Sequence, residues 1–477
     1  MKALTHPILA AAMFFCAATG EGLAGEKEAQ ALLDAIADMS GAPGLSAAVS
    51  QNGIMIWAGQ SGFADLERKK PVTQTTRFRI ASVSKLLTAA LALKLSADGL
   101  LNLDEDVRTY VPDWPDHDGA IITLRQLAAH TSGIAHYGAG DRRTPFNEDD
   151  RLNDSLAIYA HKLLLSAPGE AYNYSSYGYA LMGAAIENAA GSSFEEALSA
   201  HLIEPLSLRR TSVEDIRNLP AEASRLYGQG GATLTPNNQR AVLGATGILS
   251  TPGDLVHFAD AYMRGDIVGS QLVEQSLTPA TLNNGDPVDA GRFAVGFGWR
   301  IGENWEGETV FHHAGLTPGA RSILTVNAGR KLSAALLSNA SWTSRIETTG
   351  EMIAAAAAEH PDPKTCPTGE WLYEGIFASD PGAYPEPDNA RGSVSLFVDD
   401  GICRMNLAPR GELAAWLARL PGDAKEMTAI MVAERPSGLV FAVATPWGAF
   451  PLYVSGTASL ELKGEFAGRT VDLSLRQ

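Results

Sequence analysis

The chain has 477 residues, of which 45% are hydrophobic and 19% are charged. This composition is sufficient to bury a substantial core and excludes a disordered tail. The formal net charge of −17 argues against a surface that follows nucleic-acid phosphates, so nucleic acid is not an expected partner.

The first 24 residues have the pattern of a secretory signal peptide. Lys2 precedes a short apolar run at residues 8–18, and small residues follow. The run is too short for a membrane-spanning helix, and polar residues interrupt every later long apolar stretch. We expect cleavage after Ala24, with Ala18 as the alternative, and a secreted or periplasmic protein without a stable membrane span.

The three cysteines, Cys16, Cys366 and Cys403, are too few for a disulfide scaffold or a multi-cysteine zinc or iron–sulfur site. Removal of the leader would leave only Cys366 and Cys403. An oxidising compartment permits a disulfide between them. Sequence alone leaves this pairing open.

The pattern from residue 45 to residue 360 predicts an α+β domain. Two apolar runs within residues 45–65 flank an Asn-Gly turn, which is typical of a β-hairpin. Helical spacing predicts helices at residues 82–98, 155–165, 179–190, 255–264 and 344–359. Strand patterns occur at residues 293–301, 309–313, 320–327 and 332–339. Strands on both sides of a helical region predict one antiparallel sheet that carries a helical insertion.

Residues 361–369 are expected to be a linker because they begin with a proline-rich turn. Short β-like runs follow at residues 393–398, 439–444, 450–454 and 471–475. They predict a small β-rich domain over residues 370–477, for which a barrel is one arrangement. The first domain then covers residues 25–360.

Ser82 and Lys85 form an S-x-x-K tetrad at the start of a predicted helix. Residues three apart share a helix face, so the Lys85 amine can reach the Ser82 hydroxyl and remove its proton. A helix N-terminus also favours a developing anion. The alternative is a helix-capping serine followed by a solvated lysine.

Two further segments carry candidate groups. Tyr174 lies in a loop rich in hydroxyl and aromatic side chains, where it can relay a proton with a lysine or pack in the core. The stretch HHAGL at residues 312–316 ends a predicted strand. Its paired histidines lack the carboxylates of a H-E-x-x-H site, so we expect no metal and no cofactor. A G-x-S-x-G elbow is absent from the sequence.

Read in order, the motifs resemble those of the serine β-lactamase and penicillin-binding-protein superfamily. They are FRIASVSK at 78–85, LRQLAAHTSG at 124–133 and PGEAYNYSSYGYALMG at 168–183. The resemblance is to the class C-like branch, with its D-aminopeptidase, esterase and mitochondrial β-lactamase-like relatives. It implies a β-lactamase-like antiparallel sheet with a helical domain.

The resemblance also implies roles for individual residues. Ser82 corresponds to the acylated nucleophile, Lys85 to its base, and Tyr174 to the tyrosine that assists proton transfer to the leaving group. The backbone N–H groups of Ser82 and Leu316 would form the oxyanion hole. The implied substrate-binding positions are Ser176, His313 and Gly315.

Two departures from the family pattern bear on the substrate. Ser176 stands where asparagine is common, so the usual contact with an amide carbonyl is weakened. His313-Ala314-Gly315 replaces the K-T-G of β-lactamases, and a histidine is mostly neutral at pH 7. This favours a peptidase, amidase or esterase over a dedicated β-lactamase.

We therefore expect a secreted serine hydrolase that forms an acyl-enzyme at an amide or ester bond. Small peptides or D-amino-acid derivatives are the first expected substrates, with small esters and β-lactams as alternatives. A catalytically silent penicillin-binding-type sensor or scaffold is the alternative from another class. The oligomeric state is left open.

Overall fold

A computed structural model describes residues 25–138, 141, 151–342, 345–379, 390–411, 414–415, 418, 425–456, 459–466 and 469–477. The expected signal peptide at residues 1–24, including Cys16, lies outside these ranges. Within them, every helix is too short or too polar to cross a membrane.

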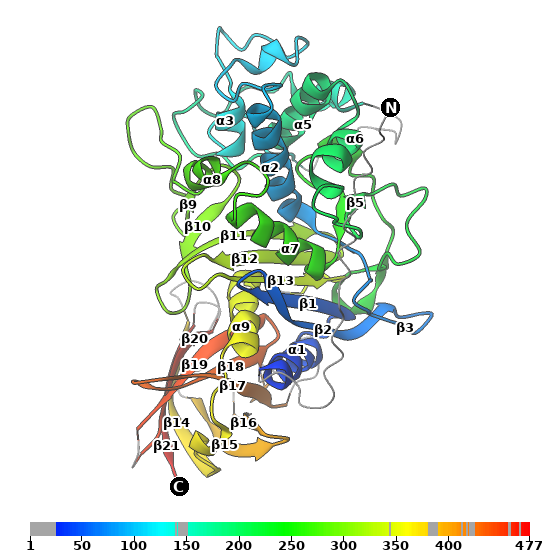
Figure 1. Cartoon of the computed structure of the whole chain (residues 1–477). Helices are drawn as coiled ribbons and strands as arrows, with labels where there is room; N and C mark the ends of the chain where they lie inside the picture. Colours follow the sequence, from blue (N-terminus) through cyan, green and yellow to red (C-terminus); the bar gives the residue numbers. More distant parts are fainter. Residues whose placement is uncertain are drawn as a thin grey trace, which may run out of the picture.

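An eight-stranded antiparallel sheet lies at the centre of the molecule (Figure 1). Its order is β3-β2-β1-β13-β12-β11-β10-β9, so the N-terminal hairpin pairs with a strand almost 300 residues later in the chain. The bounds are β3 Lys70–Pro71, β2 Ile54–Asp65, β1 Gly44–Gln51, β13 Leu332–Ser338, β12 Ala320–Asn327, β11 Thr309–Thr317, β10 Arg300–Glu303 and β9 Ala294–Val295.

The central strands are buried on both faces, as shown by β13. Its residues alternate between two hydrophobic cores: Ala335 and Leu337 face one, and Ala334 and Leu336 face the other. The first core is covered by α2 (Ser84–Ala97), α3 (Leu124–Ala128), α4 (Leu156–Tyr159), α5 (Ser176–Ala190), α6 (Phe194–Leu198), α7 (Pro252–Met263) and α8 (Ser270–Ser276). The second is covered by α1 (Glu26–Ser40) and α9 (Ile346–Ala358).

Short strands guide the chain between these layers. β4 (Phe78–Arg79), β8 (Ile248–Ser250) and β5 (Ser212–Val213) form a three-stranded sheet. β6 (Leu226–Tyr227) and β7 (Thr233–Leu234) form a separate pair. Within the three-stranded sheet, β4 lies immediately before Ser82 in the chain, so it sets the direction in which the backbone enters α2.

The C-terminal strands form a closed antiparallel barrel below α1 and α9 in Figure 1. They are β14 (Gly369–Ser379), β15 (Ala390–Asp399), β16 (Ile402–Arg410), β17 (Met427–Arg435), β18 (Gly438–Thr445), β19 (Gly448–Ser455), β20 (Glu461–Phe466) and β21 (Arg469–Arg476). The barrel closes because β14 pairs with both β15 and β21, and closure leaves no unpaired edge strand. Its apolar side chains are continuous with the α1 and α9 core.

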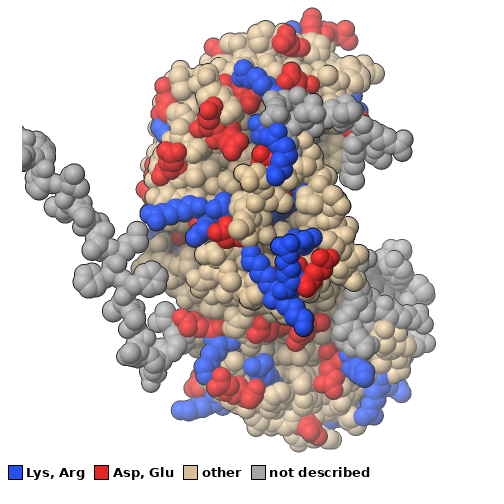
Figure 2. Space-filling model, turned by 90° about the vertical axis from the view of Figure 1, so that its right-hand side faces the viewer, with Lys and Arg blue, Asp and Glu red and all other residues tan. Residues whose placement is uncertain are grey.

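The surface carries both signs of charge. On the face drawn in Figure 2, Lys and Arg side chains gather at mid-height, with Asp and Glu beside them and over both domains. On this face, acidic and basic side chains are therefore interspersed.

The predicted fold class is confirmed, including the β-rich C-terminal domain, which is a barrel. The domain boundaries near residues 360 and 369 stay predictions. The predicted helix at residues 155–165 is wrong beyond Tyr159, because Leu163 and Leu165 are exposed and provide no buried helix face. The predicted strand at residues 293–301 is split by a turn in which Gly298 has a φ of 87°.

A disulfide joins Cys366, just before β14, to Cys403 on β16. The Cα atoms are 5.6 Å apart, within the range that a disulfide spans. The bond closes a loop across 37 residues of sequence separation and ties the entry of the barrel to its third strand. The open pairing of the two cysteines is thus resolved in favour of a disulfide.

We expect the double variant Cys366→Ser, Cys403→Ser to lower the free energy of unfolding by about 2–4 kcal/mol, because the unfolded chain gains loop entropy. Denaturant unfolding of the oxidised wild type and the variant measures this difference. A reducing agent should bring the wild type to the variant's midpoint and leave the variant unchanged. Equal midpoints for oxidised and reduced wild type would contradict a stabilising disulfide.

Candidate active site

Ser82 lies at a strained junction between strand and helix. The backbone leaves β4, passes Ala81 with a φ of 46°, and forms one 3-10 turn before α2 begins. A positive φ at a residue with a side chain costs on the order of 1–3 kcal/mol and persists only where the surrounding structure imposes it. Ser82 is half-buried, whereas Lys85, one turn later, is fully buried.

The Lys85 amine lies between three oxygen atoms. Its Nζ is 3.1 Å from Ser82 Oγ, 3.2 Å from Ser176 Oγ and 3.0 Å from the Ala245 carbonyl oxygen. Among the described residues, it pairs with no carboxylate. Burial lowers the pKa of Lys85, and the positive charge of Arg300 lowers it further. The lowered pKa favours the neutral amine, which can accept a proton.

Tyr174 also reaches Ser82. Its hydroxyl is 3.0 Å from Ser82 Oγ, and the Lys85 amine lies 5.0 Å from its ring centroid. Burial by itself raises the pKa of Tyr174, but the charges of Lys85 and Arg300 and hydrogen bonds from Ser82 and Lys85 outweigh burial. The net pKa lies below the ordinary tyrosine value, which favours proton relay.

Two histidines position the segment that carries Tyr174. The Ser175 N–H donates to His130 Nδ1 at 3.1 Å, and the Ser176 N–H donates to His136 Nδ1 at 3.1 Å. Burial lowers the pKa of His130 far below its usual range, so Nδ1 is free to accept. The sequence motif contained His130 but gave it no role, and His136 carried no motif signal.

The start of α5 extends this support. Ser175 caps the helix by accepting from the Gly178 N–H at 2.9 Å, and its own hydroxyl donates to the Ala135 carbonyl at 3.0 Å. The cap places Ser176 in the first turn, where its hydroxyl contacts Lys85. Ser176 therefore lies at the site, against the candidate base.

β11 passes directly beside the nucleophile. A Cβ atom at Gly315 would lie 2.4 Å from the Ile80 carbonyl oxygen and 3.1 Å from the Ala81 Cβ, so only glycine fits this contact. Ser322 on β12 donates to the same Ile80 carbonyl at 2.6 Å. These contacts bring the backbone of Leu316 next to the turn that carries Ser82. The expected oxyanion donors thus come from neighbouring segments.

His313 faces the site without supplying a charge. Its ring centroid is 6.4 Å from that of Tyr174, and Nδ1 lies 2.8 Å from the Ala314 carbonyl oxygen. Burial, followed by the charges of Arg300 and Lys85, holds the pKa of His313 far below its usual range. The imidazole is therefore neutral where β-lactamases carry a lysine.

Arg300 is a cation of the site that sequence reasoning missed. Its guanidinium carbon is 5.8 Å from the Tyr174 ring centroid and 4.5 Å from that of Phe293. Within the described chain it forms no hydrogen bond, and its ion pair with Glu347 is long, at 3.8 Å. The only available signal was its position in a predicted strand near His313. Spare guanidinium donors thus lie beside Tyr174.

The residues around Ser82 provide nucleophile, base and proton-relay chemistry, with all three polar groups in hydrogen-bond reach. Among the described residues, no group of three or more His, Cys, Asp or Glu side chains could hold a metal ion. What the geometry can perform is addition of a serine oxygen to a carbonyl carbon.

We expect the rate of phosphonylation of Ser82 by a fluorophosphonate to rise with pH as Lys85 loses its proton, with a midpoint below the ordinary lysine value. Because Arg300 lowers the pKa of Lys85, Arg300→Ala should move this midpoint upward. Arg391→Ala, in the exposed part of the barrel, is the control. An identical midpoint in Arg300→Ala would contradict the electrostatic coupling.

Comparisons with known proteins agree with this geometry. Penicillin-binding protein 4* of Bacillus subtilis (strain 168) is 26% identical over 411 residues, which cover 78% of this chain and 87% of that protein. Protein flp of Staphylococcus aureus (strain N315) is 28% identical over 304 residues, or 62% of this chain. This chain matches only 59% of the length of flp.

Solved structures show the same fold. The octameric penicillin-binding protein homologue from Pyrococcus abyssi has a TM-score of 0.60 at 19% identity, covering 94% of this chain and 99% of that one. D-amino acid amidase from Ochrobactrum anthropi SV3 has a TM-score of 0.57 at 24% identity, covering 66% and 91%. A family profile described as Beta-lactamase matches residues 29–358. This match spans most of the chain and includes Ser82, Lys85 and Tyr174. The chain therefore belongs to the Beta-lactamase family.

Proposed function

We propose that this protein is a serine hydrolase that cleaves amide or ester bonds through an acyl-enzyme. One observation carries the proposal: Ser82 Oγ lies within 3.1 Å of both a buried amine and a phenol. Because Lys85 has no carboxylate partner in the described chain, its neutral form is accessible and can act as a base. Family membership supports the same chemistry.

In the proposed mechanism, the Ser82 hydroxyl gives its proton to Lys85 as its oxygen bonds to the substrate carbonyl carbon. The backbone N–H groups of Ser82 and Leu316 stabilise the oxyanion. Tyr174 then passes a proton to the leaving nitrogen or oxygen as that bond breaks. Water attacks the acyl-enzyme, the proton returns to Ser82, and the acid product departs.

The position of Arg300 indicates the substrate class. The oxyanion lies on the side of Leu316, whereas Tyr174 protonates the leaving group, so the leaving group lies on the side of Tyr174. Arg300 is the cation on that side, with unused guanidinium donors. A guanidinium recognises a carboxylate through charge-assisted hydrogen bonds. We therefore assign a leaving group that ends in a carboxylate, as in a small peptide with a free C-terminus.

The relatives support small peptides and D-amino-acid derivatives. They include a D-stereospecific amidohydrolase, a D-amino acid amidase and penicillin-binding proteins. We rank small esters next and β-lactams third, and the neutral His313 and the short Ser176 support this order. A secreted or periplasmic location is supported by the leader pattern of residues 1–24 and by the disulfide.

We expect a fluorophosphonate to label the wild type and to leave Ser82→Ala unlabelled. Parallel assays with D-amino-acid amides, dipeptides, p-nitrophenyl esters and nitrocefin then rank the substrate classes. Labelling and hydrolysis that do not depend on Ser82 would contradict the enzyme and support a silent sensor or scaffold. Nitrocefin turnover faster than peptide turnover would instead identify a β-lactamase.

We expect Arg300→Ala to lower kcat/KM about tenfold to one-hundredfold for a peptide with a free C-terminal carboxylate, because one charge-assisted contact is lost. The same peptide with a C-terminal amide should lose less than about threefold. Arg300→Lys, which retains the charge, should recover part of the difference. Equal losses for both peptides would rule out carboxylate recognition by Arg300.

A further inference from the structure

The β10–β11 hairpin connects the site to the barrel. Its base carries Arg300 on β10 and His313 on β11, and its tip is the turn at residues 304–308. Four residue pairs, from Arg300↔His312 to Glu303↔Thr309, separate base and tip. At about 3.3 Å per residue the tip is roughly 10 Å from the site. The same short ladder therefore connects the tip to Arg300.

The hydrolase domain holds this hairpin weakly on one side. The outer neighbour of β10 is β9, which contributes only two residue pairs at the edge of the sheet. A cavity of about 20 Å³, with room for a single water, lies beside the tip between Trp305, Thr325 and Glu351. Its own domain still holds the tip through polar contacts, because Asn327 Nδ2 donates to Glu308 Oε2 at 2.6 Å and Arg330 donates to Glu306 at 3.2 Å.

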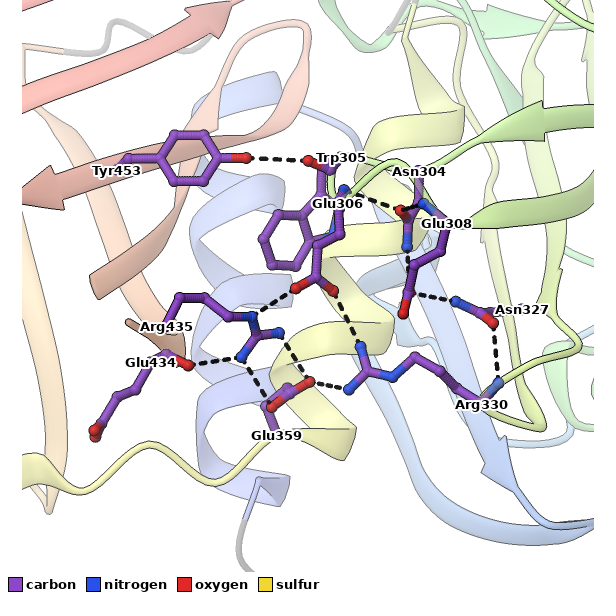
Figure 3. Close-up of polar contacts among 10 residues, drawn as sticks. All are labelled: Asn304, Trp305, Glu306, Glu308, Asn327, Arg330, Glu359, Glu434, Arg435 and Tyr453. Atoms are coloured by element: carbon purple, nitrogen blue, oxygen red, sulfur yellow. Dashed lines mark hydrogen bonds and ion pairs between the residues drawn. The ribbon is translucent and has the colours of Figure 1, made fainter. Parts of the chain in front are cut away.

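The barrel adds a further anchor, Arg435, which completes a closed ring of four charges (Figure 3). Arg435 on β17 donates to Glu306 in the hairpin tip at 2.6 Å and to Glu359 after α9 at 3.1 Å. Arg330, in the turn between β12 and β13, donates to Glu306 at 3.2 Å and pairs with Glu359. Each carboxylate therefore lies between two guanidinium groups.

A second contact fixes the tip to the barrel. The Tyr453 hydroxyl on β19 donates to the Trp305 carbonyl at 3.1 Å, and the Arg435 guanidinium lies 5.6 Å from the Trp305 ring centroid. Within the turn, Asn304 Oδ1 accepts from the N–H groups of Glu306 and Glu308. The turn is thus rigid, and the barrel holds it as a unit.

The ring is more protected than an ordinary surface ion pair. Its four side chains are between 18% and 28% exposed, and the charges cancel. The hydrogen bond to Glu306 raises the pKa of Arg435, while Arg330 and Arg435 together lower the pKa of Glu359 despite its burial. A bidentate arginine in a network holds its geometry better than an isolated exposed pair.

We infer that Arg435 is a positioning residue for catalysis: from the barrel, it holds the β10–β11 hairpin so that Arg300 meets the substrate's leaving group. This inference rests on the proposed function of Arg300. It gives the barrel a part in substrate binding although the barrel lies on the opposite face of the sheet from Ser82. Loss of the anchor frees Arg300 and leaves Ser82, Lys85 and Tyr174 in place.

The test compares Arg435→Ala with Lys27→Ala in the full-length protein. Lys27 on α1 forms another ion pair with the barrel, 2.8 Å from Asp400, away from the hairpin. Hydrogen exchange over residues 300–308, which needs no substrate, should accelerate in Arg435→Ala only. KM for the peptide with a free carboxylate should rise about threefold to tenfold, with kcat and the C-terminal amide little changed.

Arg435→Lys keeps the charge but cannot bridge both carboxylates, so its KM should lie between those of wild type and Arg435→Ala. Unchanged exchange of the hairpin in Arg435→Ala would overturn the anchor, whatever the substrate. Accelerated exchange with unchanged KM would overturn its link to substrate binding. A failure of the proposed function appears separately, as absence of Ser82-dependent labelling or as equal losses of kcat/KM for both peptides in Arg300→Ala.

Discussion

The central strands of the sheet are buried on both faces, and this requirement organises the whole molecule. Residues 334–337 of β13 alternate between two cores, so each face needs its own cover. The long insertion between β3 and β9 covers one face with helices and brings Ser82, Lys85 and Tyr174 over it. α1, α9 and the barrel cover the other. The site and the barrel therefore lie on opposite faces of the same sheet.

The site is built around Lys85, which has no carboxylate partner among the described residues. An ammonium group buried without a carboxylate is costly, which favours the neutral amine that a base requires. His130, His136 and His313 surround the site but supply neutral acceptors or ring surface, so the polar groups order the backbone without restoring a salt bridge. Arg300 lies beside Tyr174, and its positive charge further disfavours a proton on Lys85.

The hairpin of β10 and β11 connects Arg300, beside the site, to Arg435 in the barrel. Strands transmit displacement along their length, since each residue pair is held by the ladder. α9 lies along the same path: Glu347 near its start pairs with Arg300, and Glu359 after its end pairs with Arg435. The barrel shares the apolar core of α1 and α9. Through these ion pairs and the hairpin it can influence the position of Arg300.

Motifs close in sequence determined much of this protein. The strand and helix patterns, together with the family resemblance of the motifs, were sufficient to predict the fold class. The S-x-x-K spacing, the Tyr174 loop and the strand ending at Leu316 selected residues that lie together in space. The apolar spacing of Leu32, Leu33 and Ile36 also marked α1, although it was not recognised. Only the tertiary structure decided the pairing of Cys366 with Cys403, the roles of His130 and His136, and the place of Arg300 beside Tyr174. These depend on contacts between segments far apart in the chain, for which local periodicity holds no information.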